Sequence, residues 1–281
     1  VNHETYEDAA GNWLSPDDVI RENGKVATRQ GGAVTIGRST KMSKSKKNVV
    51  DPSEIFQTYG ADTARWYMLS DSPPERDLEW TSSGVEGAWR FNQRVWRLVS
   101  EGLDWLPPSK TKKPSQMNDA ATEIRRATHR AIAGVTDAIE NFSFNTAVAQ
   151  IYELSNTLSA VNPTSKEEQW ALREGFESLV RLIEPMMPHL AHELWTQLGH
   201  STLLTDTPWC KAETALLSAN TTTVAIQVNG KLRTTLELSP DLPKNELKRL
   251  ALAEDRVQSA IADKEIKRVI VVPNRIVNIV I

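Results

Sequence analysis

The spacing of the apolar residues changes once along the chain, and this change limits the possible folds more than any other feature. Between residues 83 and 199, apolar side chains recur every three or four positions, which is the pattern of amphipathic helices. From Thr221 they alternate with polar residues instead, and the alternation runs into Asn229-Gly230, a strong signal for a β-hairpin. A helical region followed by a strand-rich one predicts at least two domains, for which 281 residues are sufficient.

The helical region is expected to form an antiparallel bundle, which we assign to residues 76–210. Its first helix is predicted to begin at a capping box formed by Ser83 and Glu86. After a polar, proline-containing linker, further helices are predicted at 119–140, 144–161, 166–184 and 188–199. The breaks between them are short, which favours antiparallel neighbours.

The regions on either side of the bundle are expected to differ from it. Residues 1–40 predict loops and small strands, and two short helices capped by Asp51 and Asp62 follow. The tail predicts a ββαββ α/β domain, with a helix at 243–262 and its last strands at 269–272 and 276–281. The chain is therefore expected to be multidomain and mainly α, with domains at 1–75, 76–210 and 221–281.

Charge is unevenly distributed along the chain. The net charge is -3, yet residues 221–281 hold ten Lys and Arg against seven Asp and Glu. The loop from Arg38 to Lys47 has five basic residues and no acidic one. This distribution suits a protein that meets a polyanion through selected patches, although many other proteins share it.

Several classes of protein are disfavoured by the sequence. No apolar run approaches the length of a membrane helix, so no membrane partner is expected. The single cysteine, Cys210, excludes an intrachain disulfide and favours a reducing cytoplasm. The chain starts at Val1 with neither an initiator methionine nor a signal peptide, so we expect an excised fragment or a processed start.

One short motif carries chemistry. Lys41-Met42-Ser43-Lys44-Ser45 lies in the basic loop, directly before a capped helix. Lysine ammonium groups can neutralise the charge that builds on pyrophosphate as it leaves ATP, and hydroxyl and backbone N–H groups can add hydrogen bonds. On the Lys/Ser run alone, however, a solvated loop is the more common outcome.

The residues around this motif favour the chemical interpretation. The segment from Lys41 to Trp80, which includes KMSKS and NVVDP…YGADTARWYM, closely resembles the signature region of class I aminoacyl-tRNA synthetases. HETYEDAAGNWLSPDDV at 3–19, LEW and the helix after it, and the tail with VAIQVNGKLR and VIVVPNRIVNIVI resemble the leucyl enzymes of that class. Valyl and isoleucyl relatives remain the alternative parents at the level of the enzyme.

The resemblance implies a division of roles. Residues 1–75 would be a remnant of the catalytic α/β domain with the KMSKS loop. Lys44 and Lys41 would act at the pyrophosphate, with Ser43, Ser45 and Met42 also at the nucleotide. The cofactors would be ATP and Mg²⁺, and the partners leucine and tRNA(Leu), for a monomeric leucine-charging ligase.

The resemblance also has departures. The histidine-x-glycine-histidine motif of the family is missing, and so are most of the nucleotide-binding fold and the editing domain. We therefore expect the chain alone to bind tRNA weakly and not to aminoacylate it. A stand-alone tRNA-binding or scaffold module is the competing hypothesis, against which the retained KMSKS loop argues.

Two groups of basic residues are candidates for contact with tRNA. Arg90, Arg94 and Arg97 share one face of the predicted first bundle helix. In the tail, the candidates are Lys231, Arg233, Lys267, Arg268 and Arg275. A solvated helix face and ordinary surface charge are the respective alternatives.

The remaining candidates favour structural roles. His189 and His192 have a spacing that can ligate zinc, but the zincin pattern is incomplete, so we expect capping or packing and no metal. Tryptophans at helical positions are expected in the core or between helices: Trp66, Trp89, Trp96 and Trp195.

Overall fold

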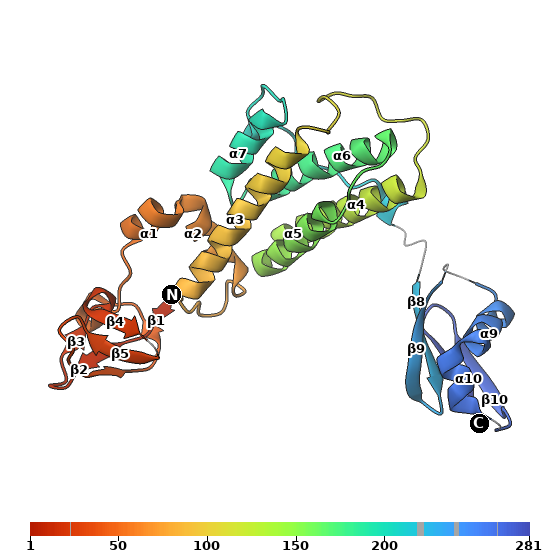
Figure 1. The fold of residues 1–281 in the computed structure, drawn as a ribbon, viewed down its shortest axis with the longest axis horizontal. Coiled ribbons are helices and arrows are strands. Elements are labelled where there is room, and N and C mark those ends of the chain that lie inside the picture. Colours follow the sequence, from red (N-terminus) through yellow and green to blue (C-terminus); the bar gives the residue numbers. More distant parts are fainter. Residues whose placement is uncertain (23, 218–221, 239–241, 263) are drawn as a thin grey trace. The chain divides into compact units, whose positions relative to one another are not determined.

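The computed structural model describes residues 1–22, 24–217, 222–238, 242–262 and 264–281. Helices dominate it, as expected for a mainly α multidomain chain, and two compact units are formed, Val1–Glu213 and Thr214–Ile281 (Figure 1). Each unit has its own cluster of buried apolar residues. Among the described residues, no helix has the length and apolar character needed to cross a bilayer. The prediction that Asp263 belongs to the tail domain concerns a residue outside the described ranges.

The first unit begins with three small antiparallel sheets, as the sequence predicts for residues 1–40. Their strands are β1 (Asn2–His3) with β7 (Thr40–Lys41), β3 (Trp13–Leu14) with β2 (Tyr6–Asp8) and β6 (Val34–Ile36), and β4 (Val19–Glu22) with β5 (Lys25–Thr28). The 3-10 turn η1 (Pro16–Asp18) lies between β3 and β4, and the 3-10 turn η2 (Lys44–Lys46) follows β7. β1 pairs with β7 over a distance of about forty residues in sequence, so the start of the chain lies beside the basic loop.

Two short helices, α1 (Pro52–Tyr59) and α2 (Ala61–Ser70), follow the loop. The Asp51 cap is confirmed, because its Oδ1 accepts a hydrogen bond from the Ser53 N–H at 2.8 Å. The predicted Asp62 cap of α2 is wrong: Gly60 occupies that place and Asp62 lies inside the helix. The Asp62 Oδ2 accepts instead from the Leu190 N–H at 2.8 Å, at the start of a helix more than a hundred residues away.

The long helix α3 (Ser82–Gly102) begins before the predicted capping box. Its cap is Thr81, whose Oγ1 accepts from the Gly84 N–H at 3.2 Å, so the prediction of Ser83 and Glu86 is wrong. Tyr67 explains the difference. Its hydroxyl accepts from the Thr81 N–H at 3.1 Å, and its ring lies so close to Gly84 that a Cβ there would be 2.4 Å from it.

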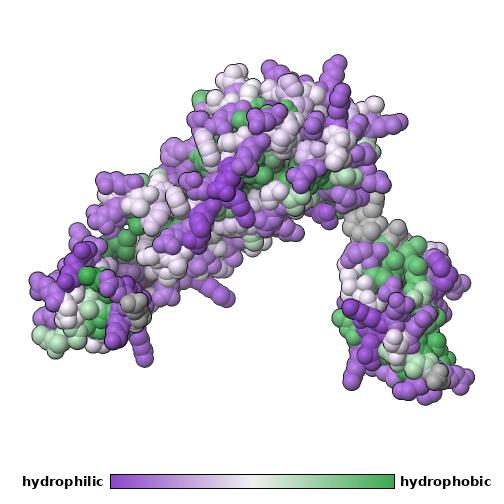
Figure 2. All heavy atoms as spheres, in the orientation of Figure 1, coloured by the Kyte–Doolittle hydropathy of each residue, from purple (hydrophilic) through white to green (hydrophobic). Residues whose placement is uncertain are grey.

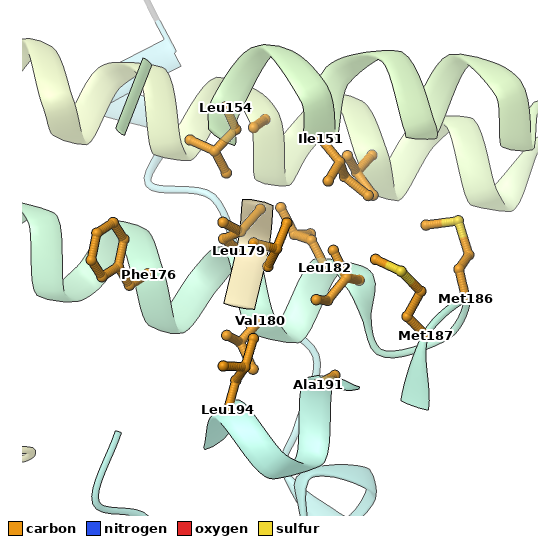
Figure 3. Packing of buried hydrophobic residues seen from close by; sticks show 14 of the residues in the cluster. Ile151, Leu154, Phe176, Leu179, Val180, Leu182, Met186, Met187, Ala191 and Leu194 are labelled. Atoms are coloured by element: carbon orange, nitrogen blue, oxygen red, sulfur yellow. The ribbon is translucent and has the colours of Figure 1, made fainter. Parts of the chain in front are cut away.

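The remaining helices of the unit are α4 (Asp119–Glu140), α5 (Phe144–Ser159), α6 (Lys166–Ile183) and α7 (Pro188–Gln197), followed by the turn η3 (Leu204–Asp206). Their bounds agree closely with the predicted ranges. α4 packs against both α5 and α6. Figure 3 shows Ile151 and Leu154 of α5 facing Leu179 and Leu182 of α6, with Leu194 of α7 on the other side of Val180. These close-packed side chains form the core that holds the bundle together.

In its described residues, the second unit combines a four-stranded sheet with three helices, of which the first is a single turn. Its elements are α8 (Thr214–Leu217), β8 (Thr222–Val228), β9 (Lys231–Leu238), α9 (Lys244–Ala253), α10 (Asp255–Ile261), β10 (Arg268–Val272) and β11 (Ile276–Val280). The strand order is β10-β11-β8-β9, with β11 parallel to β8. Asn229 and Gly230 both have positive φ, which is the requirement of the predicted two-residue hairpin.

The single helix predicted at 243–262 is wrong, because extended backbone at Glu254 divides it into α9 and α10. The division lets Leu247 of α9 and Val257 of α10 enter the same core beneath the sheet. In one continuous helix these side chains, ten residues apart, would point about 80° away from each other around the helix axis. Figure 2 shows hydrophobic patches on this unit's surface, where Leu232, Ile270 and Val272 are among the exposed apolar residues.

Candidate functional site

The KMSKS loop is a compact turn between β7 and α1. Lys41 ends β7, and Ser43 caps η2 by accepting a hydrogen bond from the Lys46 N–H at 3.3 Å. The Ser43 and Ser45 hydroxyl oxygens lie 3.2 Å apart. Lys41, Lys44 and Ser45 are exposed, whereas Met42 and Ser43 are half-buried. The turn therefore presents two ammonium groups and a hydroxyl to solvent, the groups that a phosphate binds.

Asn48 organises this turn, and the sequence reading missed it. Its side chain is fully buried. The Oδ1 accepts from the Ser43 N–H at 2.9 Å, and the Nδ2 donates to the carbonyl oxygens of His3 and Thr40, each at 3.1 Å. The only sequence signal was an uncharged polar residue at the end of a run of lysines.

β1 connects the KMSKS loop to the start of α3. On one edge β1 pairs with β7, and the Val1 carbonyl accepts from the Met42 N–H at 3.2 Å. On the other edge Asn2 donates to the Leu78 carbonyl and accepts from the Trp80 N–H, both at 2.7 Å. The loop and the segment that leads into α3 thus share one strand.

His3, on this strand, is half-buried. Burial lowers its pKa below the ordinary value for histidine, and a hydrogen bond to the Asn48 backbone opposes that shift only in part. A neutral imidazole beside the loop adds no charge to it.

The three α3 arginines do not share one environment. Arg90 and Arg97 are exposed, and Arg90 pairs with the exposed Glu86 at 3.7 Å. Arg94 is half-buried between α3 and α5: its Nη2 donates to the Ser155 Oγ at 2.9 Å, and its guanidinium lies 5.2 Å from the centre of the Phe91 ring. Arg90 and Arg97 are free to face a polyanion, while Arg94 is engaged within the bundle.

Two tryptophans lie beside the exposed arginines. The expectation of a position in the core or between helices is confirmed for Trp66 and Trp195, which are buried. Trp89 and Trp96 are 39% and 38% exposed, and the Trp89 ring contacts only the Tyr59 ring of α1 among the aromatic contacts of the described residues. Trp89 and Trp96 are seven residues apart and so occupy one helix face. Each tryptophan directly precedes one of the exposed arginines in sequence, and exposed indole rings are side chains on which nucleic-acid bases can stack.

The five basic residues predicted in the tail are all exposed, but they do not form one cluster. Lys231 and Arg233 belong to β9, and Lys267 and Arg268 lie at the start of β10. The strand registers bring these four toward the sheet end that carries the Asn229-Gly230 turn. Arg275 precedes β11, whose start lies beside Ala225, so it is near the opposite end.

The histidines considered for zinc have other partners. The His189 Nδ1 lies 2.9 Å from the Asp62 Oδ1, and the His192 Nδ1 accepts from the Leu204 N–H at 3.4 Å. Both contacts join α7 to neighbouring elements, which is the packing role that the sequence favours.

A different group of possible ligands lies between α4 and α6. His129, Glu174 and Glu213 place ligand atoms within 4.8 Å of one another. Arg125 is already among them, with its Nε 2.7 Å from the Glu174 Oε2 and its Nη2 2.5 Å from the Glu213 Oε1. Burial alone would raise the pKa of Glu174, but hydrogen bonds from His129 and Arg125 and the Arg125 charge outweigh it and lower the pKa. The guanidinium supplies the positive charge that a metal would otherwise bring.

Two family models match the chain. The anticodon-binding domain of tRNA ligases matches residues 121–249, and the class I tRNA synthetases for I, L, M and V match residues 30–81. The second match covers the KMSKS loop.

Individual proteins agree with the family matches. The chain is 49% identical to a leucine–tRNA ligase of Rhodospirillum centenum and 50% identical to one of Parvibaculum lavamentivorans; each alignment covers 100% of this chain but 34% and 33% of the relative. A crystal structure of the ternary complex of Agrobacterium radiobacter K84 agnB2 LeuRS, tRNA and LeuAMS is 32% identical, with a TM-score of 0.72 over 85% of this chain and 31% of that one. The chain spans about a third of the length of these relatives.

Proposed function

Because the chain belongs to the leucine–tRNA ligase family of class I synthetases, we propose that it supplies the KMSKS loop and part of the tRNA-binding surface of such a ligase. The intact ligase would activate leucine with ATP and transfer it to the 3′ end of tRNA(Leu). The valyl and isoleucyl alternatives lose support, because the relatives that align over the whole chain are leucine–tRNA ligases.

The proposed activation step is a displacement at phosphorus. A carboxylate oxygen of leucine forms a bond to the α-phosphorus of ATP, and the bond from that phosphorus to the bridging oxygen breaks. The electron pair leaves with pyrophosphate, where negative charge increases. Lys44 first and Lys41 second would neutralise this charge, with hydrogen bonds from Ser43 and Ser45 and contacts from Met42. Mg²⁺ would arrive bound to the nucleotide phosphates.

The observation that carries this proposal is the exposure of Lys41 and Lys44 on a turn whose base is held by β7 and buried Asn48. Because the backbone of the turn is held at these points, the ammonium groups remain exposed, but the region of space that they can reach is limited. Preorganised charge of this kind stabilises a transition state without reorganisation during the reaction.

The test is ATP–pyrophosphate exchange by the intact ligase. Lys44→Ala is expected to lower kcat about 100-fold, and Lys41→Ala to lower it less, because each removes positive charge from the departing pyrophosphate. Lys25→Ala, at an exposed lysine of β5, is the matched control and should leave exchange unchanged. Undiminished exchange by the double variant Lys41→Ala, Lys44→Ala would refute the proposal.

The proposed tRNA surface has two parts. Arg90 and Arg97 would contact the tRNA body from α3, with Arg94 supporting the helix from within. In the second unit, the proposed contacts are Lys231, Arg233, Lys267, Arg268 and Arg275. The family match to an anticodon-binding domain supports a tRNA role for the bundle.

The division into a catalytic remnant at 1–75, a bundle at 76–210 and a tail domain at 221–281 belongs to the same proposal, as do a monomeric state and a cytoplasmic location. Since the chain spans a third of its relatives, we expect it to bind tRNA alone but not to aminoacylate it. Turnover by the isolated chain in the exchange assay would contradict this expectation and favour a different enzyme.

A further inference from the structure

We propose that Asn48 is a positioning residue for amino-acid activation, which holds the KMSKS turn so that Lys44 reaches the departing pyrophosphate. This inference rests on the proposed function of the loop. Asn48 itself would touch neither ATP nor leucine, since its side chain is fully buried.

The Asn48 side-chain amide uses both its N–H donors and its oxygen acceptor in hydrogen bonds to backbone groups. The two N–H bonds go to carbonyl oxygens on different strands, His3 of β1 and Thr40 of β7. The oxygen accepts from the Ser43 N–H, the residue that caps η2. Because both carbonyl partners need a donor and the Ser43 partner needs an acceptor, the orientation of the amide is determined by its partners.

These bonds fix both ends of the segment that carries Lys44. Asn48 directly follows Lys47, whose backbone is left-handed with φ of 53°. Its side chain bonds back to Ser43, the residue before η2. Between these points the chain is short; Lys44 and Lys47 are exposed, whereas the half-buried Lys46 donates to the Thr40 Oγ1. Without the amide, Ser43 would lose its link to His3 of β1 and Thr40 of β7, although β7 itself would stay paired, and the Lys44 ammonium group would spread over a larger volume. Misplacement of a group that acts in the transition state lowers kcat more than it changes binding.

Aspartate cannot replace this asparagine, although it has nearly the same shape. The carboxylate lacks both donors and would direct negative charge at the carbonyl oxygens of His3 and Thr40. A protonated aspartic acid regains one O–H donor. Burial near carbonyl oxygens raises the pKa of such a group, so the defect of Asn48→Asp should depend on pH, whereas asparagine does not titrate.

The experiment measures ATP–pyrophosphate exchange by the intact ligase with Asn48→Asp. We expect kcat to fall at least about 10-fold near neutral pH, the effect of a lost buried hydrogen bond, with little change in KM for leucine. The ratio of variant to native kcat should rise as the pH is lowered. Asn92→Asp is the matched control, because the half-buried Asn92 on α3 donates to Thr63 and does not contact the loop; its ratio should not show this rise.

A double-mutant cycle separates positioning from general destabilisation. If Asn48 acts through Lys44, adding Asn48→Asp to Lys44→Ala should cost little further kcat. Additive losses, or a pH-independent ratio equal to that of the Asn92 control, would overturn the inference. Asn48→Ala provides the same cycle if Asn48→Asp does not fold. If Lys44→Ala alone leaves exchange unchanged, the proposed function of the loop fails instead.

Discussion

At the scale of single residues, the strongest electrostatic constraint is Arg125. Its side chain is only 5% exposed, yet it carries a full charge between Glu174 and Glu213. The His129 Nδ1 accepts a hydrogen bond from the Glu213 N–H at 3.0 Å, which leaves the His129 Nε2 to donate to Glu174. The donors and acceptors of this group are therefore paired with one another, and removing Glu174 leaves the buried Arg125 with Glu213 as its remaining charged partner.

Glu174→Gln should lower the free energy of unfolding by about 2 kcal/mol at neutral pH, because Arg125 loses a charged acceptor. The folded-state pKa of Glu174 is lowered, so its stabilisation is present above the ordinary carboxyl pKa of 4.5 and disappears as the pH falls through the folded value. The difference between native and variant should therefore shrink in acid. Chemical denaturation across pH measures it, and Glu86→Gln, at the exposed pair with Arg90, is the control, with about 0.5 kcal/mol or less expected.

Single residues also show what sequence reading can reach. The Asp51 cap is predictable because its partner, Ser53, is two positions away. The role of Asp62 is not, because its partner Leu190 is 128 positions away, and the Asn48 bond to His3 spans 45. The family resemblance of the surrounding residues predicts a chemical role for KMSKS, but only the folded chain identifies the Asn48 hydrogen bonds that hold it.

At the scale of secondary structure, α3 has a buried side and a solvent-facing side. Val85, Phe91 and Val95 are buried, while Arg90 and Arg97 face solvent with Trp89 and Trp96. The helical period predicts the helix and its buried side. It does not distinguish an exposed tryptophan from a packed one, because whether a neighbouring element covers the indole depends on tertiary structure. The same limit explains the missed break between α9 and α10.

The two sides of α3 should respond differently to substitution. In the intact ligase, Arg90→Glu with Arg97→Glu is expected to raise KM for tRNA and reduce the salt dependence of binding by about one power of salt per lost phosphate contact, without changing ATP–pyrophosphate exchange.

Arg94→Ala should behave as a stability variant. It loses the Ser155 hydrogen bond and the contact with the Phe91 ring, worth together about 1–2 kcal/mol. Aminoacylation kinetics and thermal unfolding, measured on both variants, separate the effects. An unchanged KM for tRNA in the Arg90, Arg97 variant would remove α3 from the proposed surface.

At the scale of the whole molecule, the chain is two units with separate cores. Val224, Ile226 and Val228 of β8 and Val277 and Ile279 of β11 pack against α9 and α10 without using residues of the first unit. The change in apolar period at Thr221 is the sequence signal that predicts two separate cores, since a sheet and a helical bundle bury their apolar residues in different ways.

The isolated segment 214–281 is expected to fold cooperatively, because its core is internal to it. Its weak binding to tRNA should fall as salt rises, since the proposed contacts are to phosphate. Circular dichroism and a binding titration at several salt concentrations test both statements. Substituting Lys231, Lys267 and Arg268 by glutamine should flatten the salt dependence, and salt-independent binding by the unchanged segment would contradict phosphate contact.

The double pairing of β1 restricts motion. Two residues, Asn2 and His3, are bonded to β7 on one side, and Asn2 is also bonded to the segment at 78–80 on the other. If the whole loop moved as a rigid body, the hydrogen bonds between β1 and β7 would break, and β1 also bonds to the segment that leads into α3. Travel of the ammonium groups is thereby confined to side-chain rotation and to the few backbone torsions between Ser43 and Asn48, so the reach of the lysines is set by their own four-carbon stems.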